Sequence, residues 1–348
     1  MHADVAVIGA GIVGLSVAYE IARRGLQVVC MDPAPASRQS AGRGRIFRLT
    51  HDSAEAVTLA NMARVAWSRW EAELGAHLIR STGCAVIGED ARVHANAMRD
   101  ANAEFTWSDS GRLPQLKGIL DLDGDLKGPA LFDPSGGTID AEQTINLLYQ
   151  RVSPEPERIV RIIPQRGVVR LESMSGRTWK VDQTVVATGV DSMHLLAKLG
   201  LPMAQETYRH VRFTLRPSGP LASLDCCFLD RRRAIPSGWS FYGLRLDEGV
   251  VAVGGGWSEA PFEVRRWEPA LVRKRSELQV KAWLTLHGED SATIVGILEC
   301  DYSLVFVRLP EGAPYKIIHA DRILTIHGGN LFKFAPLIGN DVCNVLNI

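Results

Sequence analysis

Hydrophobic positions near the start of this chain follow the pattern of a strand, a helix and a second strand. Residues 5–8 form an uninterrupted apolar run, residues 12–24 place apolar side chains at helical spacing, and residues 26–31 are mostly apolar again. Short apolar runs of this kind are typical of buried strands, and the intervening spacing indicates a helix. Gly25 stands where glycine commonly ends a helix. The first 32 residues therefore predict a βαβ unit.

Farther along, the pattern changes to alternating positions that are typical of exposed sheet. Residues 158–189 alternate apolar and polar side chains between turn residues, which predicts a β-meander. Asp140 is a good N-cap for a helix over the residues that follow it. Residues 296–306 predict one more strand, and this strand carries Cys300.

Composition and charge exclude several classes of partner. The chain has 348 residues, and its 39 basic and 39 acidic side chains give a formal net charge of zero. A neutral chain gives no bulk electrostatic reason to bind nucleic acid or an anionic membrane. The six cysteines show neither a disulfide framework nor metal-ligand spacing, so we expect no metal site and a cytoplasmic protein. The length allows two domains.

The turn between the first strand and the helix carries the sequence GxGxxG, formed by Gly9, Gly11 and Gly14. The first glycine allows a tight turn, the second lets a pyrophosphate approach the backbone, and the third lets helix and strand pack closely. The helix N-terminus offers N–H groups and a positive dipole end to phosphates. Asp32, 18 residues after Gly14, can accept hydrogen bonds from a ribose diol. These residues predict a dinucleotide site but do not separate NAD from FAD.

Three further segments favour FAD, because an extended flavin needs backbone turns at both of its ends. Residues 37–51 follow the second strand as a loop with glycines and four arginines, able to lie along a cofactor. A strand ends at Thr188 and Gly189, where backbone can approach a ligand. Near the C-terminus, residues 323–340 predict a strand, a glycine turn and a helix that starts near Gly339. The cofactor-binding residues expected in that last turn are Gly329, Asn330 and Phe332.

With these segments in order, the chain resembles the FAD-dependent amine oxidases of the D-amino-acid oxidase superfamily. It is most similar to the branch of monomeric sarcosine oxidase and N-methyltryptophan oxidase. The segments that carry the resemblance are VIGAGIVGLSVAYEIARRG, GRIFRLTH, ALFDPSGGTIDAEQTINLLYQR, VDQTVVATGVDS, FYGLRL, ECDYS and HGGNLFKFAPLIG. Their order and spacing cover most of the chain.

The resemblance implies an architecture and a reaction. The fold expected is a Rossmann-like FAD-binding domain of the glutathione-reductase type with a mostly antiparallel-sheet substrate domain, α/β plus α+β. We expect the FAD domain to collect residues 1–80, 137–207 and 298–348, and the substrate domain residues 81–136 and 208–297. The reaction implied oxidises the C–N bond of a carboxylate-bearing amine, secondary or cyclic, to an imine, by hydride transfer to flavin N5. O2 is the expected acceptor, and we expect a monomer or homodimer that contacts neither nucleic acid nor membrane.

Several residues take roles from the same resemblance. Cys300 matches a cysteine bonded through sulfur to the flavin 8α carbon; the alternative is a small packed side chain. Arg48 and Lys333 match the pair that holds the substrate carboxylate; the alternatives are a surface arginine and a lysine with its ammonium in water. Tyr242 and Tyr302 match aromatic positions that line the substrate cavity, and simple sheet packing is as good an account of them.

Two further points refine the implied site. Arg45 either contacts the flavin or braces its loop. His51, His210 and His327 lie near motifs without metal-ligand spacing, and structural roles are favoured for them. The chain departs from the branch on the strand EGVVAVGGGW, where Ala252 or Val253 falls at the place of a lysine that speeds reaction with oxygen, so use of O2 is open.

Other functions remain open from the sequence. A flavoenzyme that acts on a 2-hydroxy acid would use the same two cations, since both bind a carboxylate. A flavin-binding protein with little catalysis fits the missing lysine. A nicotinamide-dependent dehydrogenase is the most distant alternative.

Overall fold

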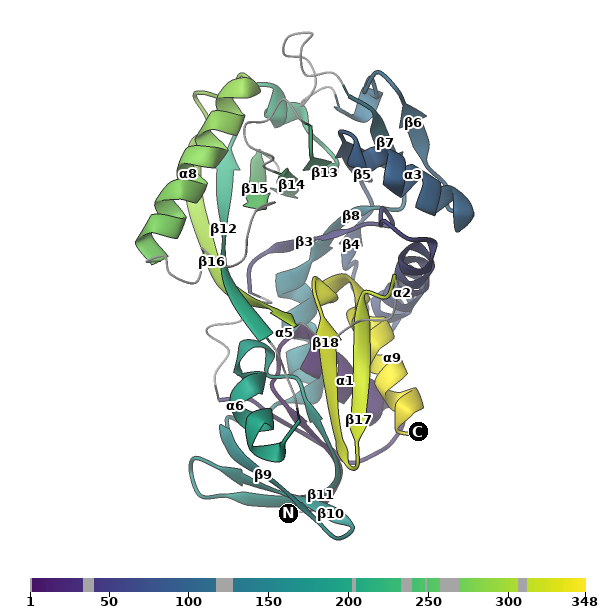
Figure 1. Ribbon diagram of the computed structural model, residues 1–348, viewed down its shortest axis with the longest axis vertical. Coiled ribbons are helices and arrows are strands. Elements are labelled where there is room, and N and C mark those ends of the chain that lie inside the picture. Colours follow the sequence, from purple (N-terminus) through teal and green to yellow (C-terminus); the bar gives the residue numbers. More distant parts are fainter. Residues whose placement is uncertain are drawn as a thin grey trace.

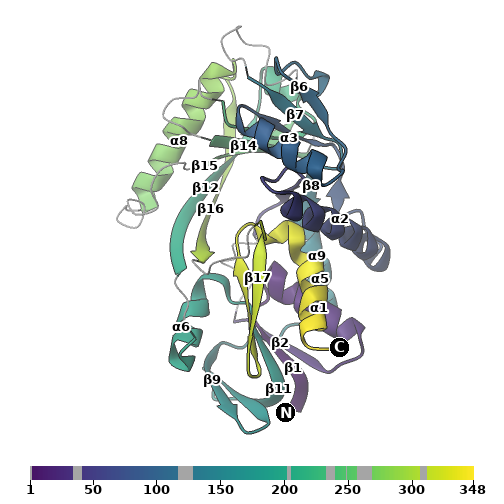
Figure 2. The same ribbon diagram turned by 45° about the vertical axis from the view of Figure 1, so that its right-hand side comes forward.

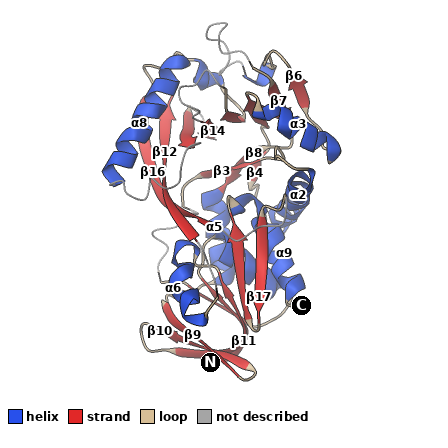
Figure 3. Ribbon diagram, in the orientation of Figure 1, coloured by secondary structure: helices blue, strands red, loops and turns tan. Residues whose placement is uncertain are grey.

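Two large β-sheets, each flanked by helices, and one small sheet make up the fold (Figure 1). Figure 3 shows the strands of both large sheets with helices along their faces. The computed structural model describes residues 2–33, 41–116, 128–201, 205–232, 240–247, 249–256, 269–305 and 312–348.

The first large sheet has seven strands, in the order β17-β18-β11-β1-β2, with β10 and β9 continuing from β11. The pairs β2–β1, β1–β11 and β11–β18 are parallel, whereas β17 is antiparallel to β18 and the meander pairs β9–β10 and β10–β11 are antiparallel. The bounds are β1 His2–Ile8, β2 Val28–Met31, β9 Ile159–Gln165, β10 Val168–Ser173, β11 Thr178–Val186, β17 Tyr315–Ala320 and β18 Ile323–Gly328. The predicted βαβ unit and meander are thus confirmed.

Helices cover both faces of this sheet. Alternate residues of β1 divide between two cores: Val5 and Val7 face α1, whereas Ala6 and Ile8 join the core that includes Leu196 of α6. On the α1 side, α5 and α9 pack beside α1 (Figure 2). The bounds are α1 Ile12–Arg23, α5 Ala141–Val152, α6 Ser192–Leu196 and α9 Ala335–Val345. Asp140 caps α5, since its carboxylate accepts a hydrogen bond from the Gln143 amide at 2.9 Å.

The last helix begins earlier than the sequence predicts. We expected its start near Gly339, but α9 begins at Ala335, with Pro336 in its first turn. Proline suits that position because its missing N–H has no partner there in any helix. Gly339 instead lies inside the helix against α1, where an added Cβ would sit 2.6 Å from Ser16 Oγ. That glycine therefore serves close helix packing and not a helix start.

The second large sheet has eight strands, in the order β16-β12-β15-β14-β13-β5-β7-β6. All neighbours are antiparallel except β13 and β5. The bounds are β5 Cys84–Ile87, β6 Thr106–Ser108, β7 Ala130–Asp133, β12 Gln205–Arg216, β13 Cys227–Asp230, β14 Ser240–Asp247, β15 Val250–Gly256 and β16 Thr293–Val305. Helix α8, Pro269–Leu286, covers one face through Trp283, which stacks on Phe228 and Phe241.

A three-stranded sheet, β3-β8-β4, lies between the two large ones (Figure 1). The bounds are β3 Gly44–Phe47, β4 Ile79–Arg80 and β8 Gly137–Asp140. Helices α2, Ala54–Leu74, and α3, Asp90–Asp100, follow β3 and β5 in the chain. We predicted residues 37–51 as a loop, and the described part of this stretch contains strand β3 instead. Its partner β8 comes from about 90 residues later, which a local pattern cannot reveal.

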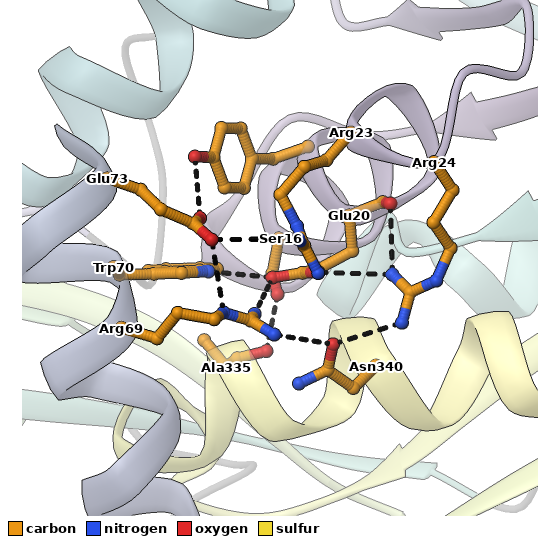
Figure 4. Close-up of polar contacts among 10 residues, drawn as sticks. Ser16, Glu20, Arg23, Arg24, Arg69, Trp70, Glu73, Ala335 and Asn340 are labelled. Atoms are coloured by element: carbon orange, nitrogen blue, oxygen red, sulfur yellow. Dashed lines mark hydrogen bonds and ion pairs between the residues drawn. The ribbon is translucent and has the colours of Figure 1, made fainter.

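A buried carboxylate joins three helices on one side of the first sheet (Figure 4). Glu20 of α1 is fully buried and accepts hydrogen bonds from Trp70 Nε1 of α2 at 2.8 Å and from Arg24 Nη1 at 3.1 Å. Arg69 of α2 also bonds to Glu20, and both Arg24 and Arg69 donate to Asn340 of α9. Because a buried charge is costly unless it is paired, this network fixes the relative positions of α1, α2 and α9.

Two of the expected domain boundaries fall inside strands of the second large sheet. The expected boundaries at 207/208 and 297/298 fall inside β12 and β16, two long strands paired along their whole length. Figure 1 shows both strands running from the second sheet toward the first. The division itself remains a prediction. Among the described helices, none combines the length and apolar character needed to cross a membrane.

Candidate active site

The GxGxxG turn lies where β1, β11 and the start of α1 meet. Gly9 has φ +99°, and an added Cβ would lie 2.6 Å from the Ala187 carbonyl oxygen at the end of β11. A Cβ on Gly14 would lie 1.8 Å from the Gly9 carbonyl oxygen. Gly11 is the N-cap of α1 and has no side chain to cover the helix N-terminus. Only glycine fits these close contacts, which is the physical reason for the motif.

The predicted ribose and turn residues surround the same point. Asp32 follows β2, and its Oδ2 accepts a hydrogen bond from the Ala10 amide in the glycine turn at 2.6 Å. Thr188 adjoins the turn, because the Cβ built on Gly9 would lie 3.1 Å from its Cα. Gly189 follows in the left-handed region, with φ +59°. A side-chain-free helix N-terminus with an acid beside it fits the pyrophosphate and ribose of a dinucleotide.

The C-terminal turn brings the other predicted cofactor residues together. Gly329 and Asn330 follow β18, and Asn330 adopts the left-handed region with φ +54°. The ring of Phe332 is buried, stacks on Trp67 at 6.3 Å between centroids, and lies 5.7 Å from the Arg45 guanidinium. Arg45 donates to the Gly44 and Ala41 carbonyls at 2.9 and 2.5 Å, so it braces its own loop. Cofactor contact by these residues stays a prediction.

Arg48 and Lys333 meet from opposite ends of the sequence. Arg48 follows β3, and its Nη1 donates to Thr50 Oγ1 at 3.1 Å. Lys333 lies in the single 3₁₀ turn between β18 and α9 and is only 5% exposed. The two charges are close enough for Arg48 to lower the pKa of Lys333, after burial as the larger cause. Within the described part of the chain, no Asp or Glu carboxylate lies within ion-pair distance of either side chain.

Two histidines, His51 and His94, complete this cluster. From the sequence we favoured a structural role for His51 and did not single out His94. His51 Nε2 lies 3.4 Å from Lys333 Nζ. Burial, followed by Lys333 and Arg48, lowers the pKa of His51 far below its ordinary value. His94 of α3 is 5% exposed, its Nδ1 has no hydrogen-bond partner among the described residues, and burial with Arg48 lowers its pKa to about 4. Both rings are therefore neutral at physiological pH.

Asp133 anchors the loop that carries Arg48, and the sequence did not single it out. Its fully buried carboxylate accepts hydrogen bonds from the Leu49 amide at 2.6 Å and the Ser135 amide at 2.9 Å. Burial raises the pKa of Asp133 to about 6. The sequence signal for Asp133 was an acidic residue between the apolar run ALF and a glycine turn. Its partner Leu49 lies 84 residues earlier, so the sequence does not reveal the contact.

Tyr242 reaches across a neighbouring strand to His210. The Tyr242 hydroxyl lies 3.0 Å from His210 Nε2, and the two rings stack at 5.6 Å between centroids. Tyr242 lies on β14 and His210 on β12, with β15 between them. A Cβ on Gly254 of β15 would lie 2.5 Å from the Tyr242 ring, so glycine at 254 is what lets the ring cross.

Cys300 and Tyr302 lie on β16, and their side chains fall outside the described residues. The backbone register sets Cys300 directly across from His210. Position 300 thus shares a strand pair with the histidine that Tyr242 contacts. The predicted bond to flavin and the predicted cavity contact remain untested.

The strand position at which the resemblance implies an oxygen-activating lysine is apolar. Ala252 and Val253 are both fully buried in hydrophobic clusters, Ala252 with Leu244 and Leu246, and Val253 with Phe213. Across the described ranges, no group of three or more His, Cys, Asp or Glu side chains could hold a metal ion.

Comparison of the sequence with known proteins finds similarity to sarcosine oxidases. The chain is 26% identical over 226 residues to monomeric sarcosine oxidase of Bacillus sp. strain B-0618, and 24% identical to that of strain NS-129. Each match covers 60% of this chain and 57% of the relative.

Solved structures share the fold across nearly the whole chain. NikD, an amino acid oxidase essential for nikkomycin biosynthesis, superposes with a TM-score of 0.79 at 20% identity, over 97% of this chain and 92% of NikD. L-proline dehydrogenase from P. horikoshii gives 0.80 at 17% identity, over 99% and 93%. Glycine oxidase from Geobacillus kaustophilus gives 0.78 at 18% identity, over 99% and 95%.

A family model described as DAO, FAD dependent oxidoreductase, matches residues 4–344. The predicted combination of a Rossmann-like FAD-binding domain and a mostly antiparallel sheet is thereby confirmed. The chain belongs to the DAO family of FAD-dependent oxidoreductases.

Proposed function

We propose that this protein oxidises the C–N bond of an amine or amino acid that carries a carboxylate, with a secondary or cyclic amine as the preferred class. The family establishes FAD-dependent oxidoreduction, and the likeness to monomeric sarcosine oxidase, over 57% of that relative's length, supports an amine or amino acid as the substrate. The carboxylate is the part of this proposal that rests on the residues around Lys333, and the amine rests on the likeness to monomeric sarcosine oxidase.

The observation that carries the proposal is a pair of cations without a counterion. Lys333 is 5% exposed, Arg48 is partly buried beside it, and neither meets a carboxylate among the described residues. Burying one ammonium without a partner is costly, and a second cation adds repulsion. A substrate carboxylate supplies the missing partner: Arg48 can grip it with two parallel N–H groups, and Lys333 acts as a point charge.

The protein's own contribution to the reaction is then binding and orientation. FAD, when bound, supplies the two-electron oxidant and accepts a hydride from the carbon beside the amine. Arg48 and Lys333 fix the carboxylate end of the substrate, so the C–H bond next to it has one orientation. Asp133 holds the Leu49 amide and thereby the backbone that carries Arg48. Tyr242 and Tyr302 line the cavity in this proposal, with His210 holding the Tyr242 hydroxyl.

Two finer features belong to the same proposal. Cys300 bonds through sulfur to the flavin, which keeps the cofactor attached. O2 is the acceptor, although the buried, apolar Ala252 and Val253 stand where the resemblance implies a lysine, so we expect slow reoxidation by O2. A cytoplasmic location belongs to the same proposal, because scattered cysteines without disulfide spacing are typical of proteins in a reducing compartment.

Anaerobic bleaching of the yellow holoenzyme tests the substrate class. We expect absorbance near 450 nm to fall on mixing with N-methylglycine, L-proline or a larger cyclic amino acid. The matched amines without the carboxylate, dimethylamine and pyrrolidine, should leave the colour unchanged. Bleaching by pyrrolidine as fast as by proline would refute the carboxylate requirement. Bleaching by 2-hydroxy acids alone would replace the amine with an alcohol.

A further inference from the structure

The cation cluster raises a question about protons that substrate binding alone does not answer. An amine is protonated at neutral pH, and an ammonium nitrogen has no electron pair with which to form the C=N bond of an imine. One proton must therefore leave the substrate before oxidation. Among the described residues around Lys333, the groups close enough to act on it are Arg48, His51, Cys84 and Asp52.

None of these four groups is well placed to accept the proton. Arg48 keeps its proton because guanidinium is not deprotonated in proteins. His51 is buried beside Arg48 and Lys333, and burial, followed by these two neighbours, lowers its pKa and so opposes a positive charge on its ring. Burial raises the pKa of the Cys84 thiol, so it already holds its proton. Asp52 is exposed to solvent and so lies outside the buried part of the cluster.

Lys333 differs from all of them. A lysine ammonium that is buried beside a second cation, with no carboxylate of the described residues within ion-pair distance, loses its proton readily. Its Nζ keeps a polar partner in His51 Nε2 at 3.4 Å, and the Trp67 indole N–H donates to its carbonyl oxygen at 2.7 Å, which fixes the backbone. These surroundings therefore favour an uncharged amine at Lys333 Nζ as long as no carboxylate is bound.

We propose that Lys333 is an uncharged amine in the substrate-free holoenzyme and that it takes up the proton a substrate ammonium must lose. One N–H bond of the ammonium breaks and one N–H bond forms on Nζ. The substrate nitrogen keeps its electron pair, and no oxidant is consumed in this step. The transfer leaves a charged Lys333 beside the carboxylate and a neutral amine ready for oxidation. This proposal rests on the proposed function, because it needs a carboxylate at the cation pair.

Proton uptake on binding of a carboxylate that has no amine isolates the step. The probe is furan-2-carboxylate, added to holoenzyme at pH 8 in a calorimeter, in HEPES and in Tris, two buffers with different ionisation enthalpies. We expect uptake of about one proton per carboxylate bound. Uptake should fall toward zero as the pH is lowered, because Lys333 is then already protonated.

Two variants assign the proton to Lys333. Lys333→Arg keeps a cation that is always charged, so it should bind the probe with no proton uptake. In this variant the rate of flavin reduction by an amino acid should also rise with pH toward the pKa of the free amine, more steeply than in the wild type. Arg48→Gln removes the neighbouring charge, so uptake at pH 8 should fall below that of the wild type.

The outcomes separate this inference from the proposed function. Tight binding with no proton uptake in the wild type would overturn the inference and leave the carboxylate site standing. Undiminished uptake in Lys333→Arg would give the proton to another group and also overturn it. No binding of the probe at all would count against both proposals.

Discussion

The contacts and the burial of individual side chains in this protein depend on the strand or turn that lies beside them. Tyr242 crosses a whole strand to reach His210 only because residue 254 is glycine. Lys333 is buried in the 3₁₀ turn before α9, where its Nζ lies 3.4 Å from His51 Nε2. The family resemblance implies that Arg48 and Lys333 belong to one site, whereas the histidines around them follow from packing that no local pattern contains.

Replacing Cys300 by serine tests whether the flavin is covalently attached. We expect the wild-type protein to keep its yellow colour in the pellet after acid precipitation, because a thioether survives denaturation. Cys300→Ser should release the colour to the supernatant. Cys343→Ser is the matched control, since Cys343 is fully buried in the α1–α9 core, and it should retain the colour. Release of flavin from the wild type would show that Cys300 is an ordinary thiol.

At the scale of elements, the network around Glu20 ties three helices of the FAD-binding half together. Arg24, Arg69 and Trp70 all bond to one carboxylate, and Asn340 links two of the arginines to α9. The arginines are partly exposed, so water retains part of their solvation, while the carboxylate is fully buried. The carboxylate therefore depends on the network more than the arginines do.

Glu20→Gln should lower the free energy of unfolding by about 1.5–3 kcal/mol, the range for a lost charge-assisted hydrogen bond. Glu73→Gln is the control, because this carboxylate is 27% exposed and its ion pairs contribute only about 0–1 kcal/mol. Urea denaturation followed by circular dichroism measures both. Equal losses for the two variants would mean that the buried network adds nothing beyond a surface pair.

The sequence predicts those elements of the fold that depend on local patterns, and it does not predict those that depend on partners far away in the chain. The strand, turn and helix around Gly9, the cap at Asp140 and the β9–β11 meander all follow from patterns within a few dozen residues. Strand β3 escaped the pattern because its partner β8 lies about 90 residues away. The start of α9 was misplaced because Gly339 serves contact with α1, which sequence alone does not place there.

For the whole molecule, a buried acid makes stability depend on pH. Burial raises the pKa of Asp133 from 3.8 to about 6, so folding favours its protonated form. The associated stability is fully present below pH 4 and is lost as the pH rises through 6, for a total on the order of 3 kcal/mol. Arg48, Cys84 and Cys227 are the titratable side chains around it.

Asp133→Asn should remove this dependence. Relative to the variant, the wild type should lose on the order of 3 kcal/mol of unfolding free energy between pH 3.5 and pH 8, measured by urea denaturation at several pH values. A constant difference between the two proteins over that range would mean that Asp133 titrates normally.

The most direct test compares two ligands of nearly the same shape, one a charged carboxylate and the other its neutral amide. Furan-2-carboxylate and furan-2-carboxamide should be titrated into holoenzyme while the flavin spectrum is followed, in the wild type, in Lys333→Met and in the exposed-site control Lys274→Met. We predict that the wild type and the control bind the carboxylate far more tightly than the amide, and that Lys333→Met weakens carboxylate binding by about 1.5–3 kcal/mol with FAD still in place. Equal affinity of the wild type for carboxylate and amide, or unchanged carboxylate affinity in Lys333→Met, would contradict it.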